Sequence, residues 1–222
     1  YTTLFRSVAD NVLTRKDNCL YVNLFFDRNY TDSDFQLSMK QKEGQSNQFT
    51  LTVLKTGNNN RLAIRKPSWA KTVALTNGKK SVQLTEKDGY LYVNQPLKPG
   101  ETFDLNLEYD MRWCGQSNET LTLPLVSKSK VALFYGPYLM SVDTGFQPFF
   151  DSEPNWSNRL IVNNNPKFVP ELAPVVSNKK NTYILMQHSH SDMFGTYPVV
   201  LRPIAETTFE LPCNVRVWFL VQ

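Results

Sequence analysis

Two pairs of carboxylates have a spacing that could support hydrolysis of a glycosidic bond. One pair is Asp151 with Glu153, and the other is Asp104 with Glu108. Such hydrolysis usually needs two carboxyl groups about 5–10 Å apart across the sugar, and alternate positions of a strand share one face. Both pairs fall in predicted loops or on polar faces of predicted strands. Solvated surface charge is therefore the simpler interpretation of each pair.

Two histidines near the end of a predicted strand form a pattern that suggests metal binding. His188 and His190 are separated by one residue, and Asp192 follows closely. A strand repeats its side-chain direction every two residues, so both imidazoles would face one side, as metal ligands can. No third ligand from elsewhere in the sequence supports a metal, and an ordinary loop accounts for the pattern. We therefore expect no metal and no other cofactor in this chain.

A polar loop that contains several aromatic side chains, residues 146–156, is the best candidate for contact with a ligand. Phe149, Phe150 and Trp156 lie in a stretch rich in proline, asparagine and serine. Loops carry binding function more often than strands do, and aromatic faces can stack on sugar rings. We predict carbohydrate contact at these three side chains. Trp69 and Trp218 lie at or in apolar strands, where burial in a core is the expected role.

The composition is that of a packed globular protein, with 41% hydrophobic and 13% aromatic residues. The net charge of +4 is spread along the chain, whereas nucleic-acid binding needs basic residues concentrated on one face. No apolar run approaches the roughly 20 residues that a transmembrane helix needs. We therefore expect neither a nucleic-acid partner nor a membrane span.

The three cysteines, Cys19, Cys114 and Cys213, are far apart in the sequence. Zinc sites usually show close cysteine pairs, and scaffolds built from disulfides contain more cysteines. Buried structural thiols are therefore expected at all three positions. The chain starts at Tyr1 without a charged-then-apolar leader, so we expect targeting information to lie upstream or to have been removed.

An N-terminal amphipathic helix is predicted over residues 3–13. Its apolar residues follow the i, i+4 spacing that places one stripe on one side: Leu4, Phe5, Val8, Ala9, Val12 and Leu13. So apolar a stripe must pack on something, either a helical domain that precedes Tyr1 or a face of the domain that follows. The sequence leaves these two alternatives open.

The rest of the chain has the period-two pattern of β-strands, interrupted by Gly, Pro and Asn turns such as Gly57–Asn60 and Asn77-Gly78. Many short strands at this spacing indicate a sandwich or jelly roll. We predict an all-β fold of two consecutive antiparallel β-sandwich or jelly-roll-like units with one short N-terminal helix. The expected parts are residues 1–17 for the helix, 18–114 for the first unit and 115–222 for the second. The apolar run from Val131 to Met140 is expected to break at Gly136-Pro137, at a bulge, corner or edge.

Several sequence blocks occur in an order that resembles the non-catalytic β-sandwich half of glycoside hydrolase family 127, the β-L-arabinofuranosidase-like proteins. The blocks are Leu20-Tyr-Val-Asn-Leu-Phe25, Ile64-Arg-Lys-Pro-Ser-Trp-Ala70, Thr76-Asn-Gly78, Gly89-Tyr-Leu, Pro99-Gly-Glu101, Met111-Arg112, Tyr135-Gly-Pro-Tyr138 and Val200-Leu-Arg-Pro203. The similarity runs over nearly the whole chain. The chain departs from the family where Ile-Arg-Lys replaces the usual Arg-Ile order and where Leu97 replaces a usual Trp, which leaves its substrate open.

The resemblance implies that catalysis belongs to a separate (α/α)6 barrel, in which a glutamate and zinc-binding cysteines form the site. No catalytic residue can be carried over to this chain, because Cys19 does not match the barrel's cysteine pair. Zinc is accordingly expected only in the barrel, and residues 1–17 are expected to be a remnant of that helical domain. The implied role is to support the barrel in degradation of plant-type glycans, and the resemblance favours a periplasmic or extracellular bacterial location.

Two other functions compete with a supporting role. One is an autonomous carbohydrate-binding module, in which Phe149, Phe150 and Trp156 would form the contact surface for a polysaccharide. The other is an independent enzyme, which the sequence favours least because no nucleophile or paired-carboxylate constellation stands out.

Overall fold

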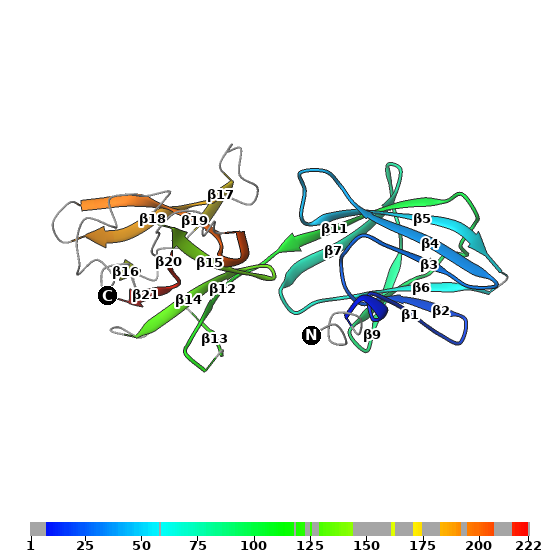
Figure 1. The fold of residues 1–222 in the computed structure, drawn as a ribbon, viewed down its shortest axis with the longest axis horizontal. Helices are drawn as coiled ribbons and strands as arrows, with labels where there is room; N and C mark the ends of the chain where they lie inside the picture. The colour runs from blue at the N-terminus through cyan, green and yellow to red at the C-terminus, as the bar shows by residue number, and fades with distance from the viewer. Residues whose placement is uncertain are drawn as a thin grey trace. The chain divides into compact units, whose positions relative to one another are not determined.

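The computed structural model divides the chain into two compact units, Tyr1–Tyr109 and Asp110–Gln222 (Figure 1). The residues that it describes are 8–57, 59–117, 119–122, 125, 129–143, 161–162, 171–174, 183–191, 195–206 and 215–221. The division falls five residues before the boundary expected after Cys114. It lies at Asp110, between the two consecutive strands β11 (Thr102–Tyr109) and β12 (Met111–Cys114).

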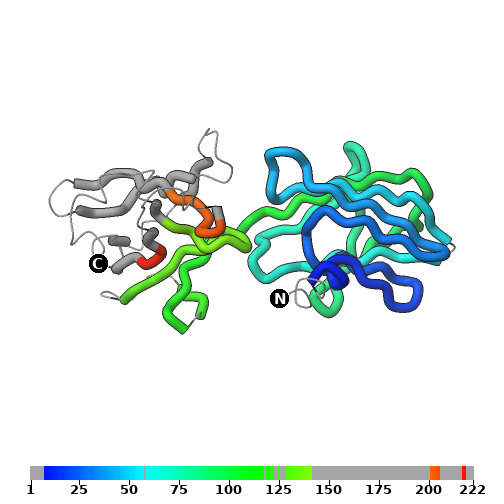
Figure 2. Tube along the Cα trace, viewed as in Figure 1, coloured from blue at the N-terminus to red at the C-terminus, as the bar shows by residue number. Residues whose placement is uncertain are grey.

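The first unit is a sandwich of two sheets (Figures 1 and 2). The five-stranded sheet contains, in spatial order, β1 (Leu13–Lys16), β2 (Cys19–Val22), β6 (Arg61–Arg65), β10 (Tyr90–Val93) and β9 (Leu84–Lys87). The six-stranded sheet contains β3 (Arg28–Thr31), β4 (Phe35–Gln41), β5 (Gln48–Thr56), β11, β7 (Ala70–Asn77) and β8 (Lys80–Ser81). The prediction of an all-β fold is confirmed. The expected antiparallel pairing has an exception, since β2 and β6 run parallel.

The core of this unit follows from the period-two pattern of its strands. Phe35, Leu37 and Met39 of β4 are buried, and the residues between them are partly exposed. The same alternation appears in β11, where Phe103, Leu105 and Leu107 are buried. Alternate residues point to opposite faces of a strand, so each strand directs one set of side chains into the core and the other set towards solvent. The outward set is the one that remains available for function.

The N-terminal helix ends earlier than the sequence predicts. Residues 1–7 lie outside the described residues, and only residues 8–10 of the remainder are helical. Leu13, expected in the helix, instead begins β1 and pairs with Val22 of β2. Residues 13–16, which were assigned to the N-terminal helical part, therefore form a β-strand. The reason is that Val12 and Leu13 are buried in the sandwich itself, which overrides a marginal helical periodicity.

Two predicted turns occur where the sequence places them. Asn77 ends β7, and Gly78 has a φ of +57° in the tight connection to β8, where Asn77 pairs with Lys80. The Gly57–Asn60 segment joins β5 to β6, and Asn59 has a φ of +65°. Glycine and asparagine are the residues that best tolerate this left-handed region.

The second unit is also built from strands, which belong to one hydrogen-bonded set. Its elements after β12 are β13 (Thr120–Leu121), β14 (Lys130–Tyr135), β15 (Tyr138–Asp143), β16 (Ile161–Val162), β17 (Glu171–Pro174), β18 (Tyr183–Ser191), β19 (Gly195–Pro203), the 3-10 turn η3 (Ile204–Glu206), β20 (Val215–Arg216) and β21 (Trp218–Val221). β16 and β21 pair in parallel, which is a second exception to the antiparallel expectation. The expected break at Gly136-Pro137 is a complete reversal, since Phe134 pairs with Leu139 across a tight hairpin.

Of the two tryptophans expected in a core, only Trp218 departs clearly from the prediction. Trp69 packs edge-on against Phe25 and Tyr109, with ring centroids 6.1 and 5.7 Å apart, and it retains some exposed surface at the end of the sandwich. Trp113 is buried. Trp218 was expected in a core but is 40% exposed. The thiols of Cys19 and Cys114 are buried and free, as predicted, and Cys213 lies outside the described residues.

Candidate functional site

Most residues that the sequence singled out for chemistry lie outside the described part of the structure. This applies to the aromatic loop with Phe149, Phe150 and Trp156, and to Asp151 and Glu153. The roles assigned to them stay predictions. His188 and His190 belong to the strand β18, and the backbone of His190 pairs with that of Thr196.

The other predicted carboxylate pair, Asp104 and Glu108, lies on the outward face of β11. Asp104 forms an ion pair with Lys42 at 3.0 Å and accepts a hydrogen bond from Thr50. Glu108 forms an ion pair with Lys71 at 3.1 Å, and the hydrogen bond from the Thr72 hydroxyl together with Lys71 lowers the pKa of Glu108. A carboxyl group that serves as a general acid needs a raised pKa, so Glu108 is unsuited to that role. Both side chains act as surface charges.

The outer face of the five-stranded sheet is the most distinctive surface of the first unit. One row of residues crosses the sheet, since Tyr21 and Tyr92 both lie opposite Ala63 in the strand registers. Ala63 is a small residue on the central strand β6, and it is fully buried beneath its neighbours. A methyl group between two tyrosines leaves a depression in the face of the sheet.

Three tyrosines form a cluster over this depression. The rings of Tyr21 and Tyr90 meet edge-to-face with centroids 5.1 Å apart, and those of Tyr21 and Tyr92 with centroids 6.3 Å apart. The Tyr90 hydroxyl donates a hydrogen bond of 2.8 Å to Asn23. Hydrogen bonding with the Tyr92 hydroxyl, together with burial, raises the pKa of Tyr21. Tyr21 therefore stays neutral at ordinary pH and keeps a proton that it can donate.

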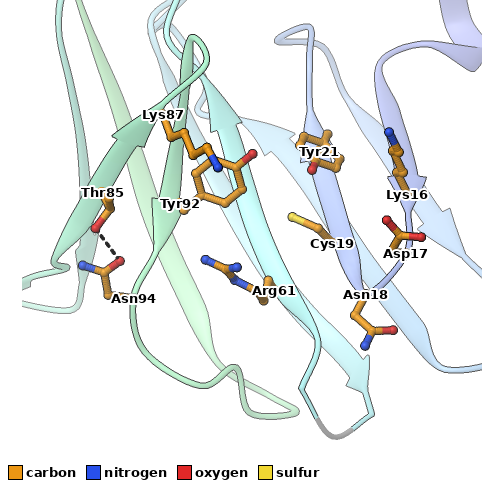
Figure 3. Close-up of a pocket in the computed structure, with 10 residues that line it drawn as sticks. All are labelled: Lys16, Asp17, Asn18, Cys19, Tyr21, Arg61, Thr85, Lys87, Tyr92 and Asn94. Carbon is orange, nitrogen blue, oxygen red and sulfur yellow. Dashed lines mark hydrogen bonds between the residues drawn. The ribbon is translucent and has the colours of Figure 1, made fainter.

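A basic side chain extends across the cluster from the central strand. The guanidinium carbon of Arg61 lies 5.2 Å from the centre of the Tyr92 ring, in a cation–π contact. In Figure 3 the guanidinium lies between Tyr92 and Asn94, while Cys19 and Tyr21 occupy the neighbouring strand. Lys87 reaches towards Tyr92 from β9, and Lys16 lies at the opposite border of the hollow, beyond Tyr21. The described residues offer Arg61 no carboxylate as an ion-pair partner.

Two adjoining hollows cover this face. The first has a volume of about 430 Å³, and its lining includes Lys16, Cys19, Tyr21, Arg61, Lys87 and Tyr92 (Figure 3). The second has a volume of about 580 Å³ and shares Lys16, Tyr21 and Tyr92 with the first. The two hollows thus lie on either side of the tyrosines and together form a groove, here called the tyrosine groove. Its size falls in the range of small-ligand sites.

The tyrosine groove was missed from the sequence, although part of its signal is visible there. In Tyr90-Leu-Tyr-Val93 the two tyrosines alternate with residues that are buried in the core, so both must face outward. Tyr21 alternates in the same way between Leu20 and Val22. The parallel pairing of β2 with β6, which brings Tyr21 beside Arg61 and Ala63, has no local sequence signature.

The described residues do not fit the zinc site that the family resemblance assigns to a catalytic barrel. The part of the chain that the structure describes contains no group of three His, Cys, Asp or Glu side chains that could hold a metal ion. Cys19 borders the tyrosine groove, but burial raises the pKa of its thiol, whereas a metal ligand must be a thiolate. The described part also contains no helix long and apolar enough to cross a membrane.

Comparison with known proteins gives an independent result for the first unit. Residues 19–111 match the family described as "Beta-L-arabinofuranosidase, GH127 middle domain". This segment is therefore similar to a GH127 middle domain. It contains every strand of the sandwich from β2 to β11. These include β2, β6 and β10, which carry the groove residues Tyr21, Arg61 and Tyr92. No curated protein matches the chain in sequence.

Solved structures extend the similarity in fold beyond the middle domain. A GH127 beta-L-arabinofuranosidase from Geobacillus stearothermophilus T6 aligns with 99% of this chain at a TM-score of 0.65 and 17% identity. A GH127 β-arabinofuranosidase aligns with 95% at a TM-score of 0.61 and 14% identity. A protein described as a glycoside hydrolase aligns with 91% at a TM-score of 0.58 and 17% identity. The chain spans 36% of the length of each of these proteins.

Proposed function

We propose that this chain is the non-catalytic β-sandwich region of a GH127-type, β-L-arabinofuranosidase-like glycoside hydrolase and that it supports a separate helical catalytic barrel. The observation that carries this proposal is the extent of the match. The chain aligns over 99% of its own length with only 36% of the Geobacillus enzyme. The remaining part of such an enzyme has no counterpart among these residues, and we propose that the catalytic barrel belongs to that part.

The charged residues of the first unit support a structural role. Several of its described carboxylates take part in ion pairs and hydrogen bonds within the sandwich, such as Asp32 with Arg15 and Asp104 with Lys42. A glycosidase site instead presents two carboxyl groups across a sugar-sized gap, one of them with a raised pKa. Among the carboxyl groups of the described residues, the resolved pKa shifts of Asp32, Asp34 and Glu108 are all downward.

An exposed apolar side chain at the start of the middle unit offers a contact for the barrel. Val8 is 47% exposed, whereas Val12, one turn later, is 4% exposed and belongs to the core of the sandwich. Exposed apolar surface is favoured at interfaces between domains. We expect Val8 to contribute to docking and Val12 to contribute to folding.

The proposal is tested by reading the gene for a segment that encodes a helical barrel, expressing that segment separately from this chain, and measuring their binding by co-purification and calorimetry. The wild-type chain is expected to bind it, and V8S is expected to weaken binding without lowering the chain's own unfolding midpoint. V12S is the matched control, and it should lower the unfolding midpoint. A gene without a helical-barrel segment, or a barrel that shows no binding to this chain, would contradict the supporting role.

A further inference from the structure

The tyrosine groove has the shape and the polar groups of a site for an extended hydroxylated ligand. Its two hollows, of about 430 and 580 Å³, meet at Tyr21 and Tyr92. Amides and hydroxyls border them, including those of Asn94 and Thr85 on one side and Asn23 and Thr14 on the other. A chain of sugar rings presents many hydroxyls along its length, which such side chains can bind.

Half-buried tyrosines supply the apolar part of the groove. Tyr21, Tyr90 and Tyr92 each keep part of the ring exposed, and their edge-to-face contacts fix the rings against the sheet. Rigid aromatic rings that carry a hydroxyl provide contact area at little cost in conformational entropy. The C–H faces of sugars pack on such rings while the ring hydroxyls remain available for hydrogen bonds.

The charges that border the groove favour an acidic ligand. Lys16, Arg61 and Lys87 line the first hollow together with a single carboxylate, Asp17. Arg65 and Asp88 line the second hollow, so the two hollows carry four cations and two carboxylates. No ion pair within the described residues occupies the head groups of Lys16, Arg61 or Lys87. A guanidinium without a carboxylate partner matches the two oxygens of a ligand carboxylate.

We propose that the tyrosine groove binds an acidic oligosaccharide, in which the rings of Tyr21 and Tyr92 contact the sugar faces and Arg61 pairs with a uronate carboxylate. Lys87 and Lys16 lie at the two borders of the first hollow, where they can meet carboxylates of neighbouring sugar units (Figure 3). This role is separate from support of a barrel. It also uses residues different from the loop that contains Phe149, Phe150 and Trp156.

The test uses the full 222-residue chain and three oligosaccharides of equal length. These are an oligogalacturonate, its fully methyl-esterified form, and a neutral arabino-oligosaccharide, each titrated by calorimetry at low and moderate salt. The oligogalacturonate is expected to bind at least tenfold more tightly than its methyl ester, because a charge-assisted hydrogen bond is lost on esterification. Its binding should weaken as salt rises, since the groove is open to solvent.

Variants locate the binding and provide controls. R61Q and Y92A should each weaken oligogalacturonate binding about tenfold or more. R28Q is the matched control, because Arg28 lies on β3 of the other sheet, away from the groove, and forms a 3.8 Å ion pair with Asp10. Circular dichroism checks that each variant remains folded. Absence of oligogalacturonate binding, equal binding of the methyl ester, or R61Q binding as tightly as wild type would each overturn the proposal.

Discussion

Arg15 and Asp32 form an ion pair of 2.6 Å that joins the edge strands of the two sheets in the first unit. Arg15 lies on β1 at the edge of the five-stranded sheet, and Asp32 follows β3 at the edge of the six-stranded sheet. The same guanidinium contacts Asp34 at 2.8 Å and Asn60 at 3.2 Å. Asp32 also accepts hydrogen bonds from the backbone amides of Asp34 and Phe35. This cluster closes one side of the sandwich.

Replacing Asp32 by alanine is expected to lower the free energy of unfolding of the first unit by about 2–3 kcal/mol, because partly buried hydrogen bonds to a charged group are lost. The measurement is unfolding in urea, monitored by hydrogen exchange in peptides that cover residues 28–41. D10A is the control, since Asp10 is exposed and its 3.8 Å contact with Arg28 should contribute under about 0.5 kcal/mol. Equal effects of D32A and D10A would contradict a structural role for the cluster.

The stability of the first unit should fall in acid, and Asp32 should account for part of the fall. Burial alone would raise the pKa of Asp32, but hydrogen bonds from Arg15, the Asp34 amide and the Tyr30 hydroxyl outweigh it and hold the pKa well below its usual range. A depressed folded-state pKa contributes stability above the unfolded pKa of about 4, and this stability is lost as the pH falls further. Unfolding free energies measured from pH 6 to 2 should therefore decline less steeply in D32N than in wild type. Identical slopes would contradict the assignment.

The hairpin between β7 and β8 depends on the backbone freedom of Gly78. Its φ is +57°, and an added Cβ would meet no atom within 4 Å, so G78A introduces strain without a clash. We expect G78A to lower the unfolding free energy by about 1 kcal/mol, the usual cost of a left-handed conformation in a residue with a side chain. K79A, in the same turn, should change it little. If G78A leaves the free energy of unfolding in urea unchanged, the turn must adopt another conformation.

The tyrosine groove predicts a specific titration. The hydrogen bond with Tyr92 is the largest contribution to the raised pKa of Tyr21, so Y92F should shift the pKa of Tyr21 back towards the ordinary value of about 10. NMR of ring-labelled tyrosines measures this directly. Y90F is the control, because the Tyr90 hydroxyl donates to Asn23 and its removal should leave the Tyr21 titration in place. A Tyr21 titration that is unaltered in Y92F would contradict the described arrangement.

Much of the fold could be predicted from the sequence because its signals are local. The alternation in β4 and β11 and the glycine at position 78 determine strand faces and a turn without reference to distant residues. The order of the blocks around Trp69 and Gly89 indicated the similarity to GH127 proteins. Leu13 was misassigned because its burial depends on pairing with Val22, which helical periodicity alone does not reveal.

The groove could not be predicted because it arises from pairing between distant strands. In the sequence, Tyr21 and Arg61 are separated by β3, β4 and β5, which belong to the other sheet. The parallel pairing of β2 with β6 brings the two residues together. Sequence reasoning instead favoured aromatic residues that are close along the chain, such as Phe149 and Phe150. Proximity along the chain is a weak guide to proximity on the face of a sheet.

The proposed non-catalytic role is tested most directly by measuring hydrolysis of an aryl β-L-arabinofuranoside by the purified 222-residue chain. A complete GH127 β-L-arabinofuranosidase serves as the positive control, and heat-denatured chain gives the background. If the chain is the non-catalytic region of such an enzyme, its turnover will equal the background with or without added zinc. Turnover by the chain alone that disappears in D151N or E153Q would contradict the account.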